Sequence, residues 1–277
     1  MSVPKLSIVI PCYNHGEYIK DAIASVERLP RELYELIIVN DGSSDAATNA
    51  LMAELAAAGY QVIEQENKGL GAARNTGIAA AAGEYILPLD SDNKIRAEFT
   101  QNAVNVLNAR PEIAIVHGDF QYYGDADFRS RIAPFDIKKM LYRNYIDACA
   151  VYRKAVWEDC GGYDTQMPVQ GVEDWDFWLN AYSRGWRFLH LDEIAFDYMF
   201  RADSMLQNTK KEENWRQIEE YMSRKYAPLL KREFADYQTW DHHGRELRRR
   251  PFRTAFRLLT NAFAPKLHKR IFRKGDS

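Results

Sequence analysis

Two aspartates separated by one residue, Asp90 and Asp92, are the pair in this sequence best suited to bind a cation. They lie at the end of the apolar run EYILPLD, which is typical of a buried strand. Side chains at i and i+2 of a strand point to the same side, so both carboxylates can offer oxygen to one divalent ion. The alternative interpretation is a turn in which an aspartate caps the following helix.

Polar residues also end three earlier apolar runs. The four polar segments are PCYN at 11–14, NDGS at 40–43, NKG at 67–69 and DSDN at 90–93. One such segment would be ordinary turn chemistry, because Asn, Asp, Gly and Ser populate turns for backbone reasons. Ligands of open parallel sheets bind outside the carboxyl ends of the strands, so four polar ends at one edge indicate a site.

The elements that would position these segments alternate between short apolar runs and longer amphipathic stretches. LSIVI, LIIVN, YQVIEQ, EYILPLD and IAIVHGD are predicted strands, and helical patterns fall between them at about 17–28, 45–58, 71–82 and 97–108. This alternation predicts an α/β fold with a mostly parallel sheet and helices on both faces. The nearly continuous apolar runs agree, because parallel strands are covered on both sides.

Beyond about residue 120 the alternation weakens, and two more helices are predicted. The stretch VEDWDFWLNAYSRGW places Trp175, Trp178, Leu179 and Tyr182 on one helical face. The other helix spans about 210–226. We expect a catalytic domain over residues 1–205 and a helical extension over residues 206–277.

Six spaced motifs give the sequence a family resemblance. PCYN, NDGSSD, ENKGLGAARNTG, DSD, GGYD and GVEDWDFW occur in this order between residues 11 and 178. In this pattern the chain resembles the family-2 inverting glycosyltransferases, which have a GT-A (Rossmann-like) fold. Several motifs in sequence order are more specific than any one of them.

The resemblance implies a nucleotide site and a metal site. Asp41 would hydrogen-bond the base, uracil by preference, and Asp92 would bind the metal that holds the diphosphate. Asp90 would face the ribose or the metal. The remaining nucleotide-binding residues would be Pro11, Tyr13, Asn14 and Arg74, with Asn75 beside them.

The resemblance also implies the catalytic residues. Glu173 and Asp174 correspond to the acidic pair of the family, with Asp174 as the general base. Inversion needs a base opposite the leaving group to take the proton of the acceptor hydroxyl, while a cation stabilises the departing diphosphate. The alternative is a solvated acidic helix start, which the helix dipole favours on its own.

Two segments depart from the pattern of the family, the DSDN turn and the segment FDYMFRADSML. Asn93 stands where many relatives carry a further aspartate, and Met199 stands where the family often has an arginine. Arg201 lies where some relatives place a metal-binding histidine. Because a guanidinium does not ligate cations, we expect Arg201 to contact the diphosphate directly. The alternative is a surface ion pair with a nearby carboxylate.

The function implied is inverting transfer of a hexose-type sugar from a UDP-sugar, with Mg²⁺ or Mn²⁺, to a glycan or lipid-linked acceptor in polysaccharide assembly. Two rivals stay open. A nucleotidyltransferase would use a similar sheet and paired aspartates, but PCYNHGEY lacks the basic, glycine-rich triphosphate loop it needs. A catalytically silent relative would be a nucleotide-sugar-binding module, which the retained Asp90, Asp92 and Asp174 argue against.

Composition predicts a cytoplasmic protein. The three cysteines have no metal-ligand spacing, and the start MSVPKLS lacks a signal-peptide pattern. No run approaches the roughly 18 apolar residues of a membrane span. Residues 245–277 hold 11 Lys and Arg against 2 Asp and Glu, whereas the rest of the chain holds 26 against 37.

This basic tail predicts an amphipathic helix that attaches peripherally to the inner face of an anionic membrane. Its apolar positions Phe252, Phe256, Leu259 and Phe263 recur at helical spacing among arginines. The alternative packs this face on the catalytic domain or on a second subunit. No nucleic-acid partner is expected, because only the tail is basic.

Overall fold

The computed structural model describes residues 4–201, 209 and 211–234, in which nine strands form one sheet. The first half of the sheet is parallel, in the order β3-β2-β1-β4. These strands are β1 (Leu6–Cys12), β2 (Tyr34–Asp41), β3 (Gln61–Gln65) and β4 (Tyr85–Pro88). Every residue of β1 is buried, as expected for a parallel strand with helices on both faces.

The second half of the sheet is mixed. Strand β8 (Val151–Arg153) lies between β4 and β6 (Ile115–Gly124) and is antiparallel to both. Strand β9 (Phe188–Phe200) runs parallel to β6, while β5 (Lys94–Ile95) pairs antiparallel with β9 and β7 (Arg129–Ser130) with β6. The mostly parallel sheet is confirmed, but the antiparallel insertion of β8 was not predicted.

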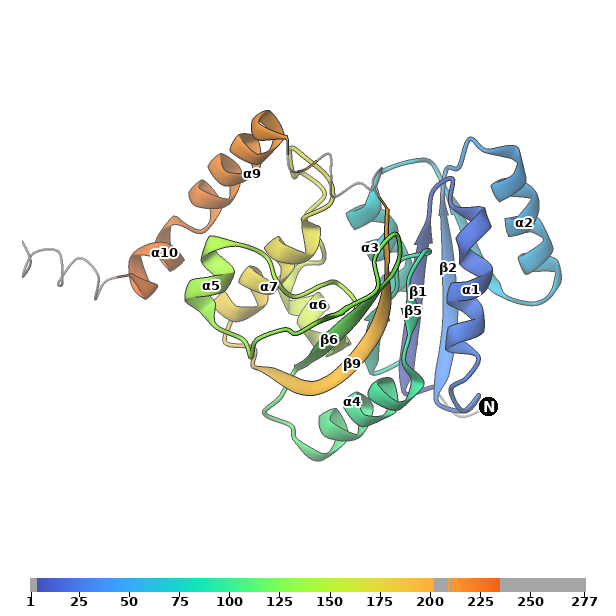
Figure 1. The fold of residues 1–277 in the computed structure, drawn as a ribbon, viewed down its shortest axis with the longest axis horizontal. Helices are drawn as coiled ribbons and strands as arrows, with labels where there is room; N and C mark the ends of the chain where they lie inside the picture. Colours follow the sequence, from blue (N-terminus) through green and yellow to red (C-terminus); the bar gives the residue numbers. More distant parts are fainter. Residues whose placement is uncertain (1–3, 202–208, 210, 235–277) are drawn as a thin grey trace, which may run out of the picture. The chain divides into compact units, whose positions relative to one another are not determined.

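Helices cover both faces of the sheet (Figure 1). Helices α1 (Gly16–Val26), α2 (Ala46–Ala57) and α4 (Ala97–Ala109) share one core with side chains of β1, β2 and β4. Helix α3 (Leu70–Ala80) packs on β1 and β2 from the other face, where aromatic side chains of α7 (Glu173–Ser183) meet Tyr152 of β8. The short helices α5 (Ile137–Tyr142) and α6 (Lys154–Cys160) contact α7.

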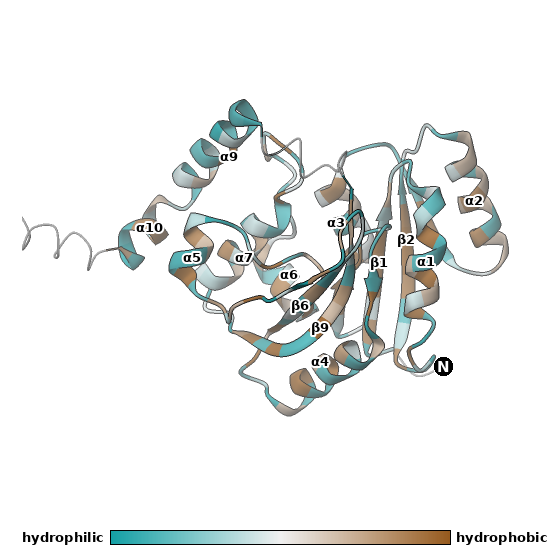
Figure 2. Cartoon of the chain, in the orientation of Figure 1, coloured by the Kyte–Doolittle hydropathy of each residue, from teal (hydrophilic) through white to brown (hydrophobic). Residues whose placement is uncertain are grey.

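Burial explains why these elements form where the sequence predicts them. Figure 2 shows hydrophobic residues along β1 and β2, whereas α9 (Glu212–Lys225) is mainly hydrophilic. Ile8, Ile10, Ile37 and Ile38 are fully buried, and each such side chain contributes about 1.5–3 kcal/mol by leaving water.

Gly77 sets the distance between α3 and the sheet. A Cβ atom there would lie 2.4 Å from Cγ1 of Val9 in β1, so a larger residue would push the helix away. Arg74 lies one turn earlier on the same helix, and the close approach therefore fixes its position at the edge of the sheet.

The chain divides into two compact units, residues 1–226 and 227–277. Helix α9 belongs to the first unit, and the described part of the second contains α10 (Ala227–Glu233). The domain division that we expected at residue 205 stays a prediction. The predicted tail helix lies outside the described residues, and none of the described helices is long and apolar enough to cross a membrane.

The end of α9 is attached to the loop and the helix that carry two of the sequence motifs. Lys225 Nζ lies 2.5 Å from Asp164 Oδ2, in the GGYD motif, and 2.8 Å from Asp176 Oδ1, in α7. The hydroxyl of Tyr226 donates to the same Asp176 carboxylate at 2.8 Å. Asp176 is buried, so these partners offset the cost of removing its charge from water.

We expect Lys225→Met to lower the free energy of unfolding by about 1–3 kcal/mol, because it leaves the buried Asp176 without its cation. The loss is smaller than for a fully buried pair, because the Lys225 side chain is 33% exposed and solvent screens its charge. Urea denaturation measures the change. Arg224→Met is the matched control and should cost less than about 0.5 kcal/mol. Among the described residues, the ion pair of Arg224 is an exposed one with Glu220. Equal losses in the two variants would contradict the prediction.

Candidate functional site

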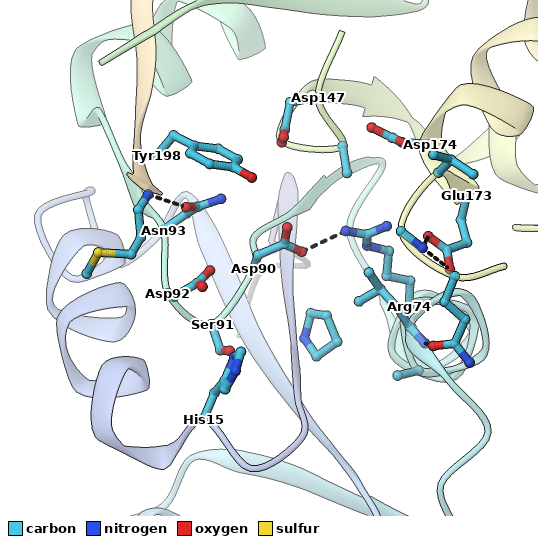
Figure 3. A pocket seen from close by; sticks show the side chains of 18 of the residues that line it. His15, Arg74, Asp90, Ser91, Asp92, Asn93, Asp147, Glu173, Asp174 and Tyr198 are labelled. Atoms are coloured by element: carbon cyan, nitrogen blue, oxygen red, sulfur yellow. Dashed lines mark hydrogen bonds and ion pairs between the residues drawn. The ribbon is translucent and has the colours of Figure 1, made fainter. Parts of the chain in front are cut away.

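A pocket of about 580 Å³ opens at the carboxyl ends of β1, β2 and β4, as the polar strand ends predict. Helix α3, the start of α7, the end of β9 and the loop over residues 144–148 complete its wall. Nine predicted site residues line it: Pro11, Tyr13, Asp41, Arg74, Asp90, Asp92, Glu173, Asp174 and Arg201. Figure 3 labels Arg74, Asp90, Asp92, Glu173 and Asp174 among them.

Asp41 ends β2 and holds the loop over residues 67–69. Its Oδ1 accepts from Gln65 Nε2 at 2.6 Å and from the backbone N–H of Lys68 at 2.9 Å, and its Oδ2 accepts from Gly69 N–H at 2.9 Å. A carboxylate has about four acceptor positions, so the described residues leave one of them open in Asp41, which lines the pocket. That capacity suits the N–H of a pyrimidine base.

Asp41→Ala is expected to weaken UDP binding by about 1–3 kcal/mol, the usual effect of removing a buried hydrogen-bond partner. Isothermal titration calorimetry measures the change. Gln65→Ala is the control, because it removes a partner of Asp41 but keeps the carboxylate. An Asp41→Ala protein that binds UDP like the wild type would show that the base lies elsewhere.

Asn14, also predicted to bind the nucleotide, does not line the pocket. It has a positive φ of 57°, and its Oδ1 accepts from the backbone N–H groups of Ser44 and Asp45 at 2.8 and 2.9 Å. Asn14 therefore joins the ends of β1 and β2. Asn75 is likewise structural, because its amide binds Trp157 and the backbone of Tyr163.

Asp90 and Arg74 form the central ion pair of the pocket. Arg74 Nη2 lies 2.6 Å from Asp90 Oδ1, and the Arg74 side chain is only 3% exposed (Figure 3). Its guanidinium also lies over the ring of Tyr163, 5.5 Å from the centroid. Arg74 Nε is buried without a hydrogen-bond partner in the described part of the chain. The pocket thus holds a fixed positive charge beside Asp90.

Asp92 faces Arg201, and their oxygen and Nη2 atoms are 3.2 Å apart. Burial, and secondarily the charge of Asp90, raise the pKa of Asp92 to about 6. Arg201 also lies over the ring of Tyr18, 4.7 Å from the centroid. Arg201 thus forms an ion pair, but with a pocket carboxylate and not at the surface as the alternative had it. A diphosphate is also expected in this pocket.

The two departures from the family pattern contact each other. Asn93 is buried, and its Oδ1 accepts from the backbone N–H of Met199 at 3.0 Å. The amide of Asn93 therefore connects the turn of Asp90 and Asp92 to β9, the strand that leads to Arg201.

Glu173 and Asp174 begin α7 but differ in their partners. Glu173 accepts from Gly171 N–H with both oxygens, at 3.0 and 2.9 Å, and so closes the turn before the helix. Asp174 accepts from Asn144 Nδ2 at 2.8 Å and from Trp175 N–H at 2.8 Å. Burial raises the pKa of Asp174 to about 6, against the opposing charge of Arg74. A carboxylate with that pKa suits general-base catalysis.

The tryptophans of α7 hold the loop that faces the aspartates. Trp175 Nε1 donates to the carbonyl of Met140 at 2.5 Å, and Trp178 Nε1 donates to the carbonyl of Ile146 at 3.0 Å. The predicted apolar face of α7 thereby packs against the chain that supplies Asn144 and Asp147.

Asp147 is a pocket residue that sequence reasoning missed. It precedes β8, and because β8 is antiparallel to β4, the start of β8 lies at the edge where β4 ends. Burial, and then the charges of Asp90 and Asp174, raise the pKa of Asp147 to about 8. The only sequence signal was an aspartate directly before a buried apolar run.

The carboxylate oxygens of the pocket are suitable ligands for a hard divalent cation. Mg²⁺ commonly binds one or two protein carboxylates and completes its shell with phosphate oxygens and water. Asp90 and Asp92 offer such oxygens. The pKa of Asp92 is raised first by burial and second by repulsion from Asp90, and a bound cation would offset both. Within the described ranges, no cluster of three or more His, Cys, Asp or Glu has the geometry of a metal site.

Comparison with known sequences gives a family match. The model of "Glycosyl transferase family 2" matches residues 7–161. The chain is 26% identical over 235 residues to the putative glycosyltransferase EpsH of Bacillus subtilis (strain 168), covering 76% of this chain and 65% of EpsH. It is 25% identical over 191 residues to poly-beta-1,6-N-acetyl-D-glucosamine synthase of Staphylococcus aureus (strain COL), covering 64% and 46%. It thus spans less than two thirds of either relative.

Solved structures share the fold. TarS 1–349 of S. aureus in complex with UDP-GlcNAc superposes with a TM-score of 0.64 at 20% identity, over 83% of this chain and 73% of that one. The mannosyltransferase PcManGT of Pyrobaculum calidifontis, in complex with GDP-Man and Mn²⁺, has a TM-score of 0.57 at 20% identity, over 73% and 59%. At these identities the likeness is one of fold.

Proposed function

Because this chain belongs to glycosyl transferase family 2 and has the GT-A fold, we propose that it transfers a sugar from a UDP-sugar to an acceptor hydroxyl with inversion. The observation that carries the proposal is one pocket in which Asp90 and Asp92 face two arginines while Asp174 borders the same space. The two aspartates and the arginines would bind the diphosphate leaving group, and Asp174 would be the base that activates the acceptor hydroxyl.

The nucleotide end is formed by Asp41, Pro11 and Tyr13. The free acceptor position of Asp41 supports recognition of a base N–H, and TarS, with the same fold, was solved with UDP-GlcNAc. Arg74 and Arg201, which pair with Asp90 and Asp92, would supply donors for the phosphate oxygens.

Asp92, with Asp90, would hold Mg²⁺ or Mn²⁺ at the diphosphate. When bound, the ion supplies positive charge that stabilises the leaving group. Asp90 is kept in place by Arg74, and Asn93 fixes the turn that carries both aspartates.

At the acceptor end, Asp174 takes the proton of the attacking hydroxyl. The hydroxyl oxygen forms the new bond to the anomeric carbon as the bond from that carbon to the diphosphate oxygen breaks, and UDP leaves with the electron pair. Asn144 orients Asp174 by its 2.8 Å hydrogen bond, and Glu173 positions the turn before α7 rather than reacting.

The acceptor we propose is a growing glycan or a lipid-linked sugar in polysaccharide assembly. The named activity of the S. aureus synthase supports this class. The division into a catalytic domain over residues 1–205 and a helical extension, and the attachment of the basic tail to an anionic membrane, remain proposals beside it.

Release of free UDP from a panel of UDP-sugars tests the function. The panel comprises UDP-glucose, UDP-galactose, UDP-GlcNAc, UDP-GalNAc and UDP-glucuronate, each with Mn²⁺ and with Mg²⁺. Turnover of at least one donor is expected. Binding of UDP without release from any donor would favour a silent binding module, and pyrophosphate release from UTP with a sugar phosphate would favour a nucleotidyltransferase.

A further inference from the structure

Asp147 is a pocket acid whose carboxyl has, among the described residues, no charged partner and no side-chain hydrogen bond. Glu173 is likewise bonded to backbone alone, but with both of its oxygens. Asp90 pairs with Arg74, Asp92 with Arg201, and Asp174 with Asn144. Among the described residues, the hydrogen bond of the Asp147 carboxyl is to the backbone N–H of Cys149, accepted by Oδ1 at 2.8 Å. The other oxygen is left for a ligand.

The position of Asp147 limits what that ligand is. In Figure 3 its carboxyl lies between Tyr198 and Asp174 and points toward Asp90. Asp90 and Asp174 are also the two carboxylates whose charges act on it most. In the proposed reaction the diphosphate lies at Asp90 and the attacked carbon lies between Asp90 and Asp174. A group beside both therefore faces the transferred sugar, not the nucleotide.

Aromatic rings form the neighbouring wall. Tyr198 lies 5.5 Å from Tyr122 and 5.6 Å from Phe120 between ring centroids, and all three line the pocket. Burial and the charge of Asp147 both raise the pKa of the Tyr198 phenol, which places the two groups near each other. One carboxyl beside aromatic rings suits a pyranose, which has apolar C–H faces and a rim of hydroxyls.

We propose that Asp147 hydrogen-bonds a hydroxyl of the transferred sugar and determines which sugars the enzyme accepts. The inference rests on the proposed glycosyl transfer and deepens it. The substrate class is a hexopyranosyl donor with a free hydroxyl at the contacted carbon. A site built around such a hydroxyl discriminates strongly against the analogue that lacks it, because its own polar group is then left unpaired.

The first arm of the test separates sugar recognition from nucleotide binding. Affinities for UDP and for the best UDP-sugar are measured for the wild type, Asp147→Ala, Asp147→Asn and the exposed control Asp125→Asn. We expect Asp147→Ala to bind UDP as the wild type does but to bind the UDP-sugar at least about tenfold more weakly. Asp147→Asn keeps an oxygen that accepts from Cys149 N–H. Any loss of UDP-sugar affinity in this variant therefore reports on the second carboxylate oxygen alone.

The second arm identifies the hydroxyl. Monodeoxy forms of that UDP-sugar are compared with the parent donor by kcat/KM. One deoxy donor should be about 10²-fold poorer or worse with the wild type, and within about threefold of the parent with Asp147→Ala. Equal discrimination in the two proteins, or equal loss of UDP and UDP-sugar affinity, would overturn the inference while leaving glycosyl transfer intact. A wild type that releases UDP from no donor would overturn both.

Discussion

Asp174→Asn is expected to lower kcat by about 10²–10⁴, the usual contribution of a positioned general base, while the affinity for the UDP-sugar stays unchanged. The amide has nearly the same shape and can still meet Asn144, but it does not take a proton. Steady-state UDP release gives kcat, and calorimetry gives the affinity. Wild-type turnover by this variant would refute the assignment.

The same residue predicts the pH dependence of turnover. Because the pKa of Asp174 is about 6, raised by burial, the wild type should lose about tenfold in kcat per pH unit below 6 and level off above it. The general base must be deprotonated, so activity falls as the pH decreases. At saturating divalent cation, where weaker metal binding at Asp92 does not limit turnover, Asp174→Asn should lack this limb.

Two variants serve as controls for Asp174. Glu173→Gln should reduce kcat less, because Glu173 hydrogen-bonds Gly171 and only shapes the turn. Asp159→Asn alters an exposed carboxylate paired with Arg184 and should leave kcat unchanged. Asp176, two residues further along α7, is not a candidate base, because it binds Lys225 and Tyr226 instead of lining the pocket.

Removal of divalent cations is expected to lower turnover by at least about 10²-fold, since a bound cation contributes several kcal/mol of charge stabilisation at the leaving group. Readdition of Mn²⁺ or Mg²⁺ should restore it. Activity after EDTA treatment and metal titration provides the measurement. Full activity in EDTA would show that the arginines alone suffice.

Asp92→Ala tests whether the required cation binds at Asp92. UDP with Mn²⁺ at 100 times its Kd should stabilise the wild type by about 2.7 kcal/mol, and the metal-dependent part of that gain should be lost in Asp92→Ala. Asp192→Asn, outside the pocket lining, is the control. Equal stabilisation by UDP with and without metal, in both proteins, would refute the metal assignment. Because the pKa of Asp92 is about 6, the metal should bind more weakly below that pH.

The sequence alone predicted the first half of the fold and most of the pocket. Apolar strands that alternate with amphipathic helices form a parallel sheet, and the carboxyl ends of parallel strands meet at one edge. Asp41, Asp90 and Asp92 could therefore be brought together from their positions after strands. Asn14 has the same position in sequence, but its left-handed backbone turns its amide to the backbone of the next loop.

The ion pairs of the pocket could not be predicted from the positions of residues after strands. Asp92 and Arg201 are 109 residues apart in the sequence. Their contact depends on the pairing of β9 with β6, to which β9 runs parallel. Arg74 meets Asp90 because Gly77 lets α3 approach β1. Each contact is a product of packing between distant segments, for which local periodicity carries no signal.

Asp147 shows the same division between sequence and structure. The run ACAVY that follows it is apolar, as a buried strand would be, but we did not predict a strand there. Only the tertiary structure decided that β8 enters the sheet antiparallel between β4 and β6. In an antiparallel strand it is the amino end that lies at the edge where parallel strands end, so a residue before the strand, not after it, enters the site. Strand direction is set by long-range pairing, and a short apolar run reads the same in either direction.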